Sequence, residues 1–152
     1  MKTMIRQASI KDTARVQHVL YQAHKQNVRC GFTFPAYNIK RNQLCYLIRR
    51  DRYYLLVVNG ITVGTVAVKR RNIFMEIGSL ALLPAYRKRG YGSKLLRYAE
   101  FKIKIMKWSS AVLFTPNDHP FLPSYYRKNG YRSRRIISFK NKKWIQFNKK
   151  LI

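Results

Sequence analysis

Hydrophobic residues recur along the chain with two different periods, and each change of period predicts a new element. Residues 4–8 alternate as a short strand does, and residues 9–12 supply capping side chains for a helix with apolar positions 16, 19, 20 and 23 on one face. Residues 27–36 mix Gly and Pro with aromatic residues, a composition typical of a loop, and residues 39–50 fit a second helix. We therefore expect the chain to begin as a strand followed by two helices.

Three strands are predicted next. Residues 53–58 and 61–69 are rich in β-branched and aromatic residues, and the Asn-Gly pair between them is a strong sign of a two-residue hairpin turn. A short basic turn separates this hairpin from a further apolar run at residues 73–83, which ends before a proline. The three runs together predict a meander of neighbouring strands.

The remainder of the chain alternates between helices and strands. A helix is expected at residues 91–106, a short buried strand at 111–114, and a short helix that stops at Gly130, with closing strands near 134–139 and 143–148. The sequence contains no internal repeat and no low-complexity linker. The order of elements predicts an α/β fold with a central mixed, mostly antiparallel sheet flanked by helices.

Length and composition agree with one folded domain over residues 1–152. Hydrophobic residues make up 47% and aromatic residues 14% of the chain, which excludes a disordered basic tail. Cys30 and Cys45 stand outside any CxxC or Cys/His pattern, so neither a disulfide framework nor a metal site is indicated, and we expect a reducing, cytoplasmic setting. No apolar run approaches the roughly 18 residues that span a bilayer, so membrane insertion is not expected.

The charge of the chain is its unusual property. The 32 Lys and Arg residues stand against 5 Asp and Glu residues, a formal net charge of +27. Self-repulsion at this level is costly, and a folded domain that tolerates it usually binds an anionic partner, such as nucleic acid, a ribonucleoprotein, an anionic membrane surface or an acidic protein. A general drift of composition toward Lys and Arg is the alternative that involves no partner.

A strand end, a basic turn and a helix start follow one another at residues 80–93. Gly90 and Gly92 let the backbone approach a ligand closely, and the free N–H groups and positive end of the helix favour an anion. Three consecutive basic residues precede Gly90 and add fixed positive charge. The segment is typical of a phosphate-binding loop, although a plain tight turn has the same local pattern.

This segment resembles motif A of the GNAT superfamily of N-acetyltransferases, in which Arg or Gln, two variable residues, Gly, one residue, and Gly or Ala bind the CoA pyrophosphate. The pattern reads Arg87, Gly90 and Gly92 here. The resemblance covers most of the chain, because the opening IRQAS-KD, the VVNG-TVG hairpin, the L-x-L-x-P strand end and a YxxxGF-like ending at residues 126–131 occur in the family's order.

The resemblance implies acetyl-CoA as the co-substrate, held largely by main-chain groups. The strand backbone at residues 80–82 would bind the pantetheine arm, and the amides at residues 88–93 would surround the pyrophosphate. The implied CoA-binding residues are Leu80, Ala81, Leu82, Arg87, Lys88, Arg89, Gly90, Tyr91, Gly92 and Ser93. The family's asparagine after the fifth strand has no clean counterpart, so a contact with CoA stays open among Asn117, Asp118 and His119.

Acyl transfer to an amine needs an unprotonated nucleophile, a donor to the thioester oxygen and a proton for the leaving thiolate. Similarity to the histone-acetylating branch of the superfamily implies Glu76 as the base, and an ion pair with one of the many basic residues is the alternative. Tyr126 falls where many family members carry the tyrosine that protonates the thiolate, and Tyr125 is its competitor. The amide of Leu82 or a neighbour would polarise the thioester carbonyl.

Other conspicuous side chains are interpreted more simply. His18 and His24 lie in the first predicted helix, where a lone histidine is usually surface or core filler. In this superfamily the loop that carries Phe32, Phe34 and Tyr37 lines the acceptor cleft, so a role in holding the acceptor is possible there.

The charge bears on the acceptor. A surface of +27 repels a lysine-rich tail or a free cationic amine. After Asp118 the chain has no further acid, and its basic residues interleave with aromatic ones, as on surfaces that bind nucleic acid. We expect an acceptor amine associated with nucleic acid, namely aminoacyl-tRNA, a base amine or a ribosomal protein. The alternatives are acetylation of a small amine or an acidic protein, and a GNAT-like module that binds nucleic acid without catalysis.

Overall fold

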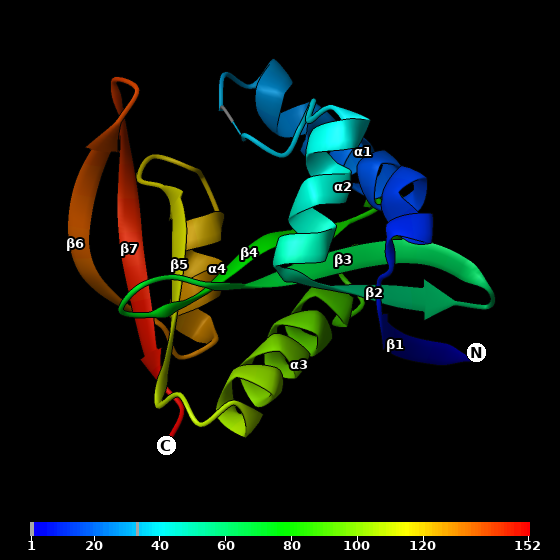
Figure 1. Ribbon diagram of the computed structural model, residues 1–152. Helices are drawn as coiled ribbons and strands as arrows, with labels where there is room; N and C mark the ends of the chain where they lie inside the picture. Colours follow the sequence, from blue (N-terminus) through cyan, green and yellow to red (C-terminus); the bar gives the residue numbers. More distant parts are fainter. Residues whose placement is uncertain (1, 33) are drawn as a thin grey trace.

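The computed structural model of the protein describes residues 2–32 and 34–152, and its helices and strands follow the predicted order (Figure 1). Residue 1 belongs to the predicted domain and residue 33 to the predicted loop at 27–36, and both lie outside this description. The elements are β1 (Thr3–Gln7), α1 (Thr13–Arg29), α2 (Arg41–Arg50), β2 (Arg52–Val58), β3 (Ile61–Arg70), β4 (Met75–Leu82), α3 (Tyr91–Ile105), β5 (Ser110–Pro116), α4 (Leu122–Lys128), β6 (Arg132–Phe139) and β7 (Lys142–Lys150).

The strands form one seven-stranded sheet with the order β1-β2-β3-β4-β5-β7-β6. All neighbours are antiparallel except β4 and β5, which run parallel. These two strands meet only at the pair Glu76–Val112, and in Figure 1 the β5-β7-β6 half stands at a steep angle to the β1–β4 half. The predicted mixed, mostly antiparallel sheet is confirmed, and it is divided at its parallel pair.

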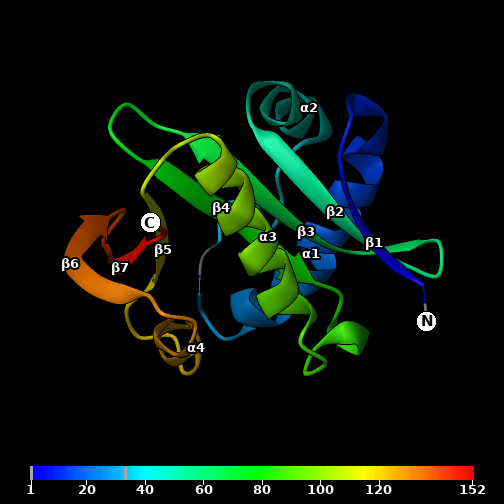
Figure 2. The same cartoon turned by 90° about the horizontal axis from the view of Figure 1, so that it is seen from below.

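Helices cover both faces of the β1–β4 half, with α1 and α2 on one side and α3 on the other (Figure 2). On the first side, Val16 and Leu20 of α1 are fully buried against Leu44 of α2 and the strands. On the opposite side, Leu95 and Leu96 of α3 are fully buried in a second cluster that reaches α4 and β7. Each helix buries the apolar face that its hydrophobic period predicts.

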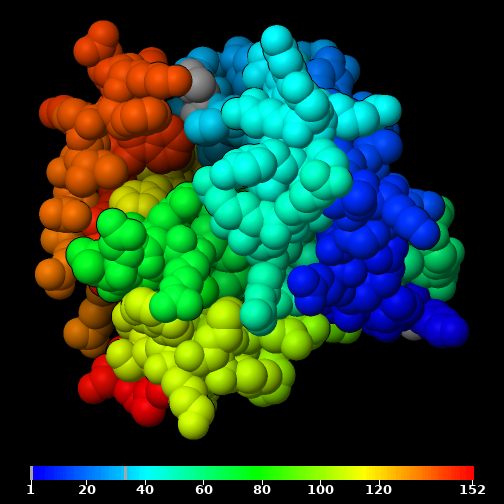
Figure 3. Space-filling view, in the orientation of Figure 1, coloured from blue at the N-terminus to red at the C-terminus, as the bar shows by residue number. Residues whose placement is uncertain are grey.

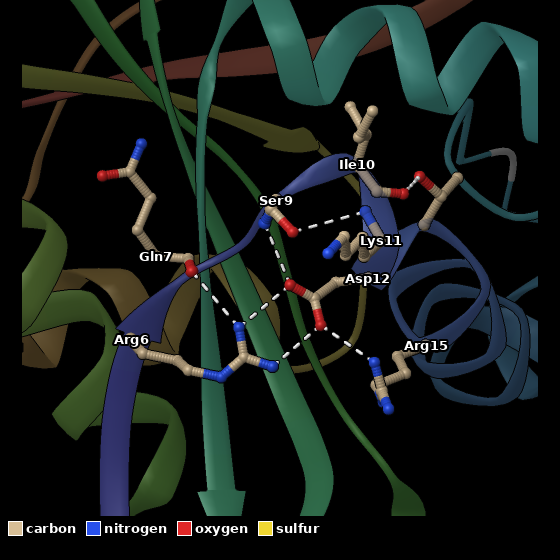
Figure 4. A network of polar contacts seen from close by, with 8 residues as sticks. Arg6, Gln7, Ser9, Ile10, Lys11, Asp12 and Arg15 are labelled. Atoms are coloured by element: carbon tan, nitrogen blue, oxygen red, sulfur yellow. Dashed lines mark hydrogen bonds and ion pairs between the residues drawn. The ribbon is translucent and has the colours of Figure 1, made fainter.

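The start of α1 is held by a polar network around Asp12 (Figure 4). The Ser9 backbone N–H donates to Asp12 Oδ2 at 2.9 Å, and Ser9 Oγ accepts from Lys11 N at 3.3 Å, which forms a capping box. The Arg6 guanidinium binds both oxygens of Asp12, at 2.9 and 2.8 Å, and holds the pKa of that carboxyl well below its usual range. The predicted capping side chains are present, but their box caps the short 3-10 turn Ile10–Asp12 that leads into α1, and Asp12, the N-cap residue of α1, makes no side-chain capping bond to that helix.

A second buried carboxylate connects α3 to the C-terminal half. Glu100 is 9% exposed and accepts from the Tyr131 hydroxyl at 2.8 Å and from Lys149 Nζ at 2.9 Å. Burial and the Glu100 charge raise the pKa of Tyr131 well above its usual value. The two halves of the sheet are therefore tied together by a charged network as well as by the apolar core.

The element ends differ from the predictions by a few residues. Helix α1 continues to Arg29, into the predicted loop, and the first left-handed residue after it is Gly31, with φ of 89°.

In the part of the chain that the structure describes, no helix has the length and apolar character needed to cross a membrane.

Candidate active site

Strand β4 carries a bulge next to the split in the sheet. Thr65 pairs with Ala81 but Ala67 pairs with Gly78, so β4 has one extra residue between these pairs. Ser79 lies there with φ of 50°, a left-handed backbone conformation that residues other than glycine rarely adopt. Because the ladder between β4 and β5 is limited to Glu76–Val112, the predicted ligand-binding backbone of residues 80–82 follows the bulge and faces the split without a strand partner on that side.

The basic turn leads into the first turn of α3. Gly90 is the N-cap residue with φ of 81°, and Lys88 is also left-handed with φ of 61°. The Lys94 N–H donates to Gly90 O at 3.0 Å, so the amides of residues 91–93 precede the first bond of the helix and are free to bind a ligand. Lys88 and Arg89 are exposed around this helix end, as an anion-binding site requires.

Arg87 has a different role from its basic neighbours. One guanidinium nitrogen, Nη2, donates to the backbone carbonyl of Ala23 in α1 at 2.6 Å. The guanidinium of Arg89 instead lies over the Tyr86 ring, 5.6 Å from its centroid. Arg87 thus holds the turn against α1, whereas the charged groups of Lys88 and Arg89 are exposed to solvent.

The two adjacent tyrosines of α4 point to different places. The Tyr125 hydroxyl lies 3.0 Å from Ser93 Oγ and would be 3.1 Å from a Cβ added at Gly92, so it covers the start of α3. Tyr126 is 8% exposed and packs in the core beside Phe147 and Tyr131. Burial raises the pKa of Tyr126 well above its usual value, so its hydroxyl keeps its proton at neutral pH.

A cavity of about 490 Å³ occupies the split between β4 and β5. Figure 3 shows the face on which α2, the β3–β4 turn and β6 border one another. Apolar and aromatic side chains from several elements line the cavity, among them Phe34, Leu80, Leu113, Tyr126, Phe139 and Trp144. Glu76 lines the same cavity, so the structure brings the predicted base and the predicted proton donor to one space.

Glu76 is engaged by a neighbouring arginine. The Arg71 Nε donates to Glu76 Oε1 at 2.9 Å, and the register partner of Glu76 across the hairpin is Lys69. Burial lowers the pKa of Lys69, and the Glu76 charge acts in the opposite direction. The ion pair that the sequence left as an alternative is present, and Glu76 also faces the cavity.

None of the three candidates after β5 lines the cavity between β4 and β5. His119 Nδ1 accepts from the backbone N–H groups of Phe121 and Leu122, so His119 Nε2 carries the proton and donates to Asn27 Oδ1 at 2.9 Å. Asn117 and Asp118 line a separate hollow of about 360 Å³. His119 therefore orients the start of α4 and joins it to α1.

His24, interpreted from the sequence as surface or core filler, lines the cavity. Its ring is 8% exposed and stacks on Phe34 with centroids 4.5 Å apart. Burial, with a smaller contribution from the Arg87 charge, lowers the pKa of His24 to about 4, so it is neutral at pH 7. A lone histidine on a helix carries no sequence signal of this placement, since the cavity forms from distant segments.

The aromatic loop contributes one of its three predicted side chains to this cavity. Phe34 lines it. Phe32 instead packs on His119, with centroids 4.8 Å apart, and Tyr37 stacks on Tyr21 at 5.0 Å. Among the described residues, no group of three His, Cys, Asp or Glu side chains gathers as metal ligands do.

Known proteins resemble this chain in sequence and fold. The acetyltransferase (GNAT) domain family matches residues 49–133, and no curated protein matches the sequence. PaiA N-acetyltransferase from Thermoplasma acidophilum, solved in complex with coenzyme A, is 21% identical with a TM-score of 0.84 over 99% of both chains. Ribosomal-protein-S18-alanine N-acetyltransferase from Escherichia coli is 15% identical with a TM-score of 0.80, over 99% of this chain and 94% of that one.

A more distant solved structure is a spermidine N-acetyltransferase SpeG chimera from Vibrio cholerae and hSSAT. It is 11% identical, with a TM-score of 0.78 over 99% of this chain and 96% of that one. At such identities each of these solved structures establishes the fold that it shares with this chain.

Proposed function

Because this chain belongs to the GNAT acetyltransferase family, and is thus an acetyl-CoA-dependent N-acetyltransferase, we propose that it binds acetyl-CoA across the split between β4 and β5 and acetylates an amine of a nucleic-acid-associated acceptor. The observation that carries the proposal is the cavity in this split, which holds both Glu76 and Tyr126. The cytoplasm is the compartment we assign to such an enzyme.

The split offers the main-chain groups that the pantetheine arm of CoA needs. After the bulge at Ser79 the backbone of residues 80–82 has no strand partner on its β5 side. Buried backbone N–H and C=O groups require hydrogen-bond partners, and the amides of the arm are suitable ones. The arm would lie alongside Leu80, Ala81 and Leu82 and direct the thioester toward the cavity.

The start of α3 is suited to the pyrophosphate. Its free amides, the positive end of the helix dipole and the exposed charges of Lys88 and Arg89 all favour an anion. Gly92 matters because a side chain there would meet the Tyr125 hydroxyl at 3.1 Å. Together with Gly90, Tyr91 and Ser93, these residues would surround the phosphates, and Arg87 would hold the turn against α1.

Two side chains would handle the protons of the reaction. The acceptor nitrogen forms a bond to the thioester carbon as the carbon–sulfur bond breaks, and the nitrogen gives up one proton while the sulfur takes one. Tyr126, protonated because its pKa is raised by burial, would supply the proton to sulfur. Glu76 would accept the amine proton through its oxygen that is not bound to Arg71, directly or through water.

The acceptor is inferred from charge and position. The net charge is +27, and β6 is an exposed edge strand that borders the cavity through Ile137 and Phe139. The exposed basic residues of β6, of the turn after it and of the start of β7 are Arg132, Arg134, Arg135, Lys140, Lys142 and Lys143. A polyanion bound along this edge would bring an attached amine close to the cavity.

A transfer assay with labelled acetyl-CoA tests this function. Nuclease-treated protein is offered aminoacyl-tRNA, ribosomal proteins and bulk tRNA, with free polyamines and amino acids for comparison. We expect labelling of a nucleic-acid-associated acceptor, at a rate that falls steeply with salt. Labelling of free amines alone, at a salt-insensitive rate, would contradict the proposed acceptor. Nucleic acid binding without acetyl-CoA binding would contradict catalysis and leave a binding module.

A further inference from the structure

The cavity contains a lysine whose charge has no obvious use in the fold. Lys69 lies on β3 opposite Glu76, and its side chain extends over Gly78 of β4. A Cβ added at Gly78 would be 3.1 Å from Lys69 Cε and 3.3 Å from Lys69 Nζ, tighter than ordinary contact. The glycine at position 78 therefore leaves the space in which the ammonium group lies, one residue before the bulge.

The charges around this group compensate it only in part. Glu76 Oε2 lies 3.6 Å from the Cβ position at Gly78 and its charge acts on Lys69, but Glu76 is also bound by Arg71. The charged side chains that line the cavity, among the residues the structure describes, are Lys69, Arg71 and Glu76. Arg71 binds Glu76 at 2.9 Å, and the nearby Arg50 and Asp51 bind each other at 3.0 Å. Lys69 Nζ makes no hydrogen bond to a described side chain or carbonyl, although burial lowers its pKa.

A further donor in the cavity wall lacks an acceptor. Trp144, which lines the cavity, has its indole N–H buried without a hydrogen-bond partner among the described residues. Leaving a buried donor unpaired is costly, so such groups usually serve a ligand or a water. Because this N–H group has almost no accessible surface, it does not itself open into the cavity, and the positive charge of Lys69 lies in a cavity whose other walls are largely apolar.

We propose that the acceptor carries an oxyanion, a carboxylate or a phosphate, close to the amine that is acetylated, and that Lys69 binds this oxyanion. The inference rests on the proposed acetyltransferase function. Lys69 Nζ lies beside Gly78, and only the bulge residue Ser79 separates Gly78 from Leu80 along β4. An amine delivered to the thioester beside Leu80 would thus leave room for only a few bonds between the nitrogen and the oxyanion.

Lys69 would give the enzyme a selectivity for its acceptor that the net charge alone does not supply. A surface of +27 attracts any polyanion, but only a cation inside the cavity distinguishes the chemical groups next to the reacting nitrogen. Amino-carboxylates and amino-phosphates are the small molecules with this pattern. The same pattern occurs at an amine attached to an acidic peptide or a nucleotide.

The test compares matched amines that differ only in the anion. β-Alanine is paired with β-alaninamide, 2-aminoethyl phosphate with ethanolamine, and phenylalanine with phenylalaninamide, and kcat/KM is measured by release of CoA. The first and second pairs distinguish a carboxylate from a phosphate. A charge-assisted hydrogen bond predicts a preference of about 10-fold or more for the anionic member of at least one pair.

Three variants assign the preference to the lysine. Lys69→Met should bring the ratio of kcat/KM values within the pair close to one, and Lys69→Arg should keep most of the preference. Gly78→Ala should weaken it, because the added Cβ displaces the lysine side chain. Circular dichroism melting of each variant confirms that the fold is retained. An anionic preference that is absent in the wild type, or unchanged in Lys69→Met, overturns the proposal.

A binding measurement separates this proposal from the function on which it rests. Calorimetric titration of acetyl-CoA tests donor binding alone, and its failure would reject the acetyltransferase proposal. If acetyl-CoA binds but no amine of the panel reacts, N-acetyl-β-alanine and its amide are titrated into the CoA complex. Tighter binding of the carboxylate that is lost in Lys69→Met supports the role of Lys69, and equal binding of the two compounds overturns it.

Discussion

Replacing Tyr126 with Phe removes one hydroxyl from the cavity and leaves the packing intact. The ring lies beside Tyr131 and Phe147, contacts that a phenylalanine ring keeps. No hydrogen bond joins the Tyr126 hydroxyl to another described residue, and its pKa is raised by burial, with a smaller contribution from Tyr125. The substitution therefore leaves no polar group unpaired, and the free energy of unfolding should change by less than about 1 kcal/mol.

The kinetic effect should be much larger. A positioned general acid contributes about 10²- to 10⁴-fold to the rate, so kcat of Tyr126→Phe should fall by this factor, about 3 to 5 kcal/mol in barrier height. The dissociation constant for acetyl-CoA should change little, since the proposed donor contacts lie on β4 and α3. In the wild type, a raised phenol pKa keeps Tyr126 protonated as the pH increases from 7 to 10, so the rate should not decline in that range through loss of this proton.

The assay is release of CoA measured over this pH range, with calorimetric titration of acetyl-CoA for each variant. Tyr125→Phe is the matched control, because it removes a neighbouring hydroxyl that lies 3.0 Å from Ser93 Oγ at the start of α3. We expect that variant to alter donor binding more than kcat. A kcat for Tyr126→Phe within about threefold of the wild type would refute the reasoning, and a large loss in Tyr125→Phe alone would move the proton donor to Tyr125.

Three further predictions concern the helix start, the buried network and pH. Gly90→Asp should weaken acetyl-CoA binding by at least about 10-fold, because it places a negative charge and a strained left-handed side chain at the N-cap, as calorimetry can measure. Glu100→Ala should lower the free energy of unfolding by about 3 kcal/mol, because the Tyr131 hydroxyl and the Lys149 ammonium lose their partner. Glu100→Gln should lower the free energy of unfolding by less, and urea titration measures both variants. The pKa of Asp12 in the folded state is depressed below its unfolded value near 4. The stabilising contribution of Asp12 is therefore complete above that value and is lost as the pH falls below it. Asp12→Asn should flatten this pH dependence of stability in melting experiments from pH 7 to 3.

The sequence predicted the order and type of the helices and strands because most of them bury a face whose period can be read locally, although β6 is an exposed edge strand. The apolar positions of α1 and α3 are buried as expected, and the Asn-Gly turn joins β2 to β3. The split in the sheet was not predictable, since it depends on β4 and β5 sharing a single ladder pair between strands far apart in sequence. The bulge at Ser79 likewise depends on register rather than on residue type.

The candidate site was only partly predictable for the same reason. The glycine-containing turn has a local pattern, so residues 87–93 stood out in the sequence. The different directions of Tyr125 and Tyr126 follow from how α4 packs, which no local pattern contains. His24 and Lys69 carry no motif, and only the folded chain places them at the cavity.

The single pair Glu76–Val112 also bears on how such a protein changes over generations. The strand and helix that we assign to the donor, β4 and α3, lie on one side of the split, while β6 and β7 form much of the opposite wall. Substitutions in the C-terminal hairpin can therefore reshape the chamber for a new acceptor without altering the register of β4. The architecture therefore separates the half that we assign to the acyl donor from a half that can diverge independently.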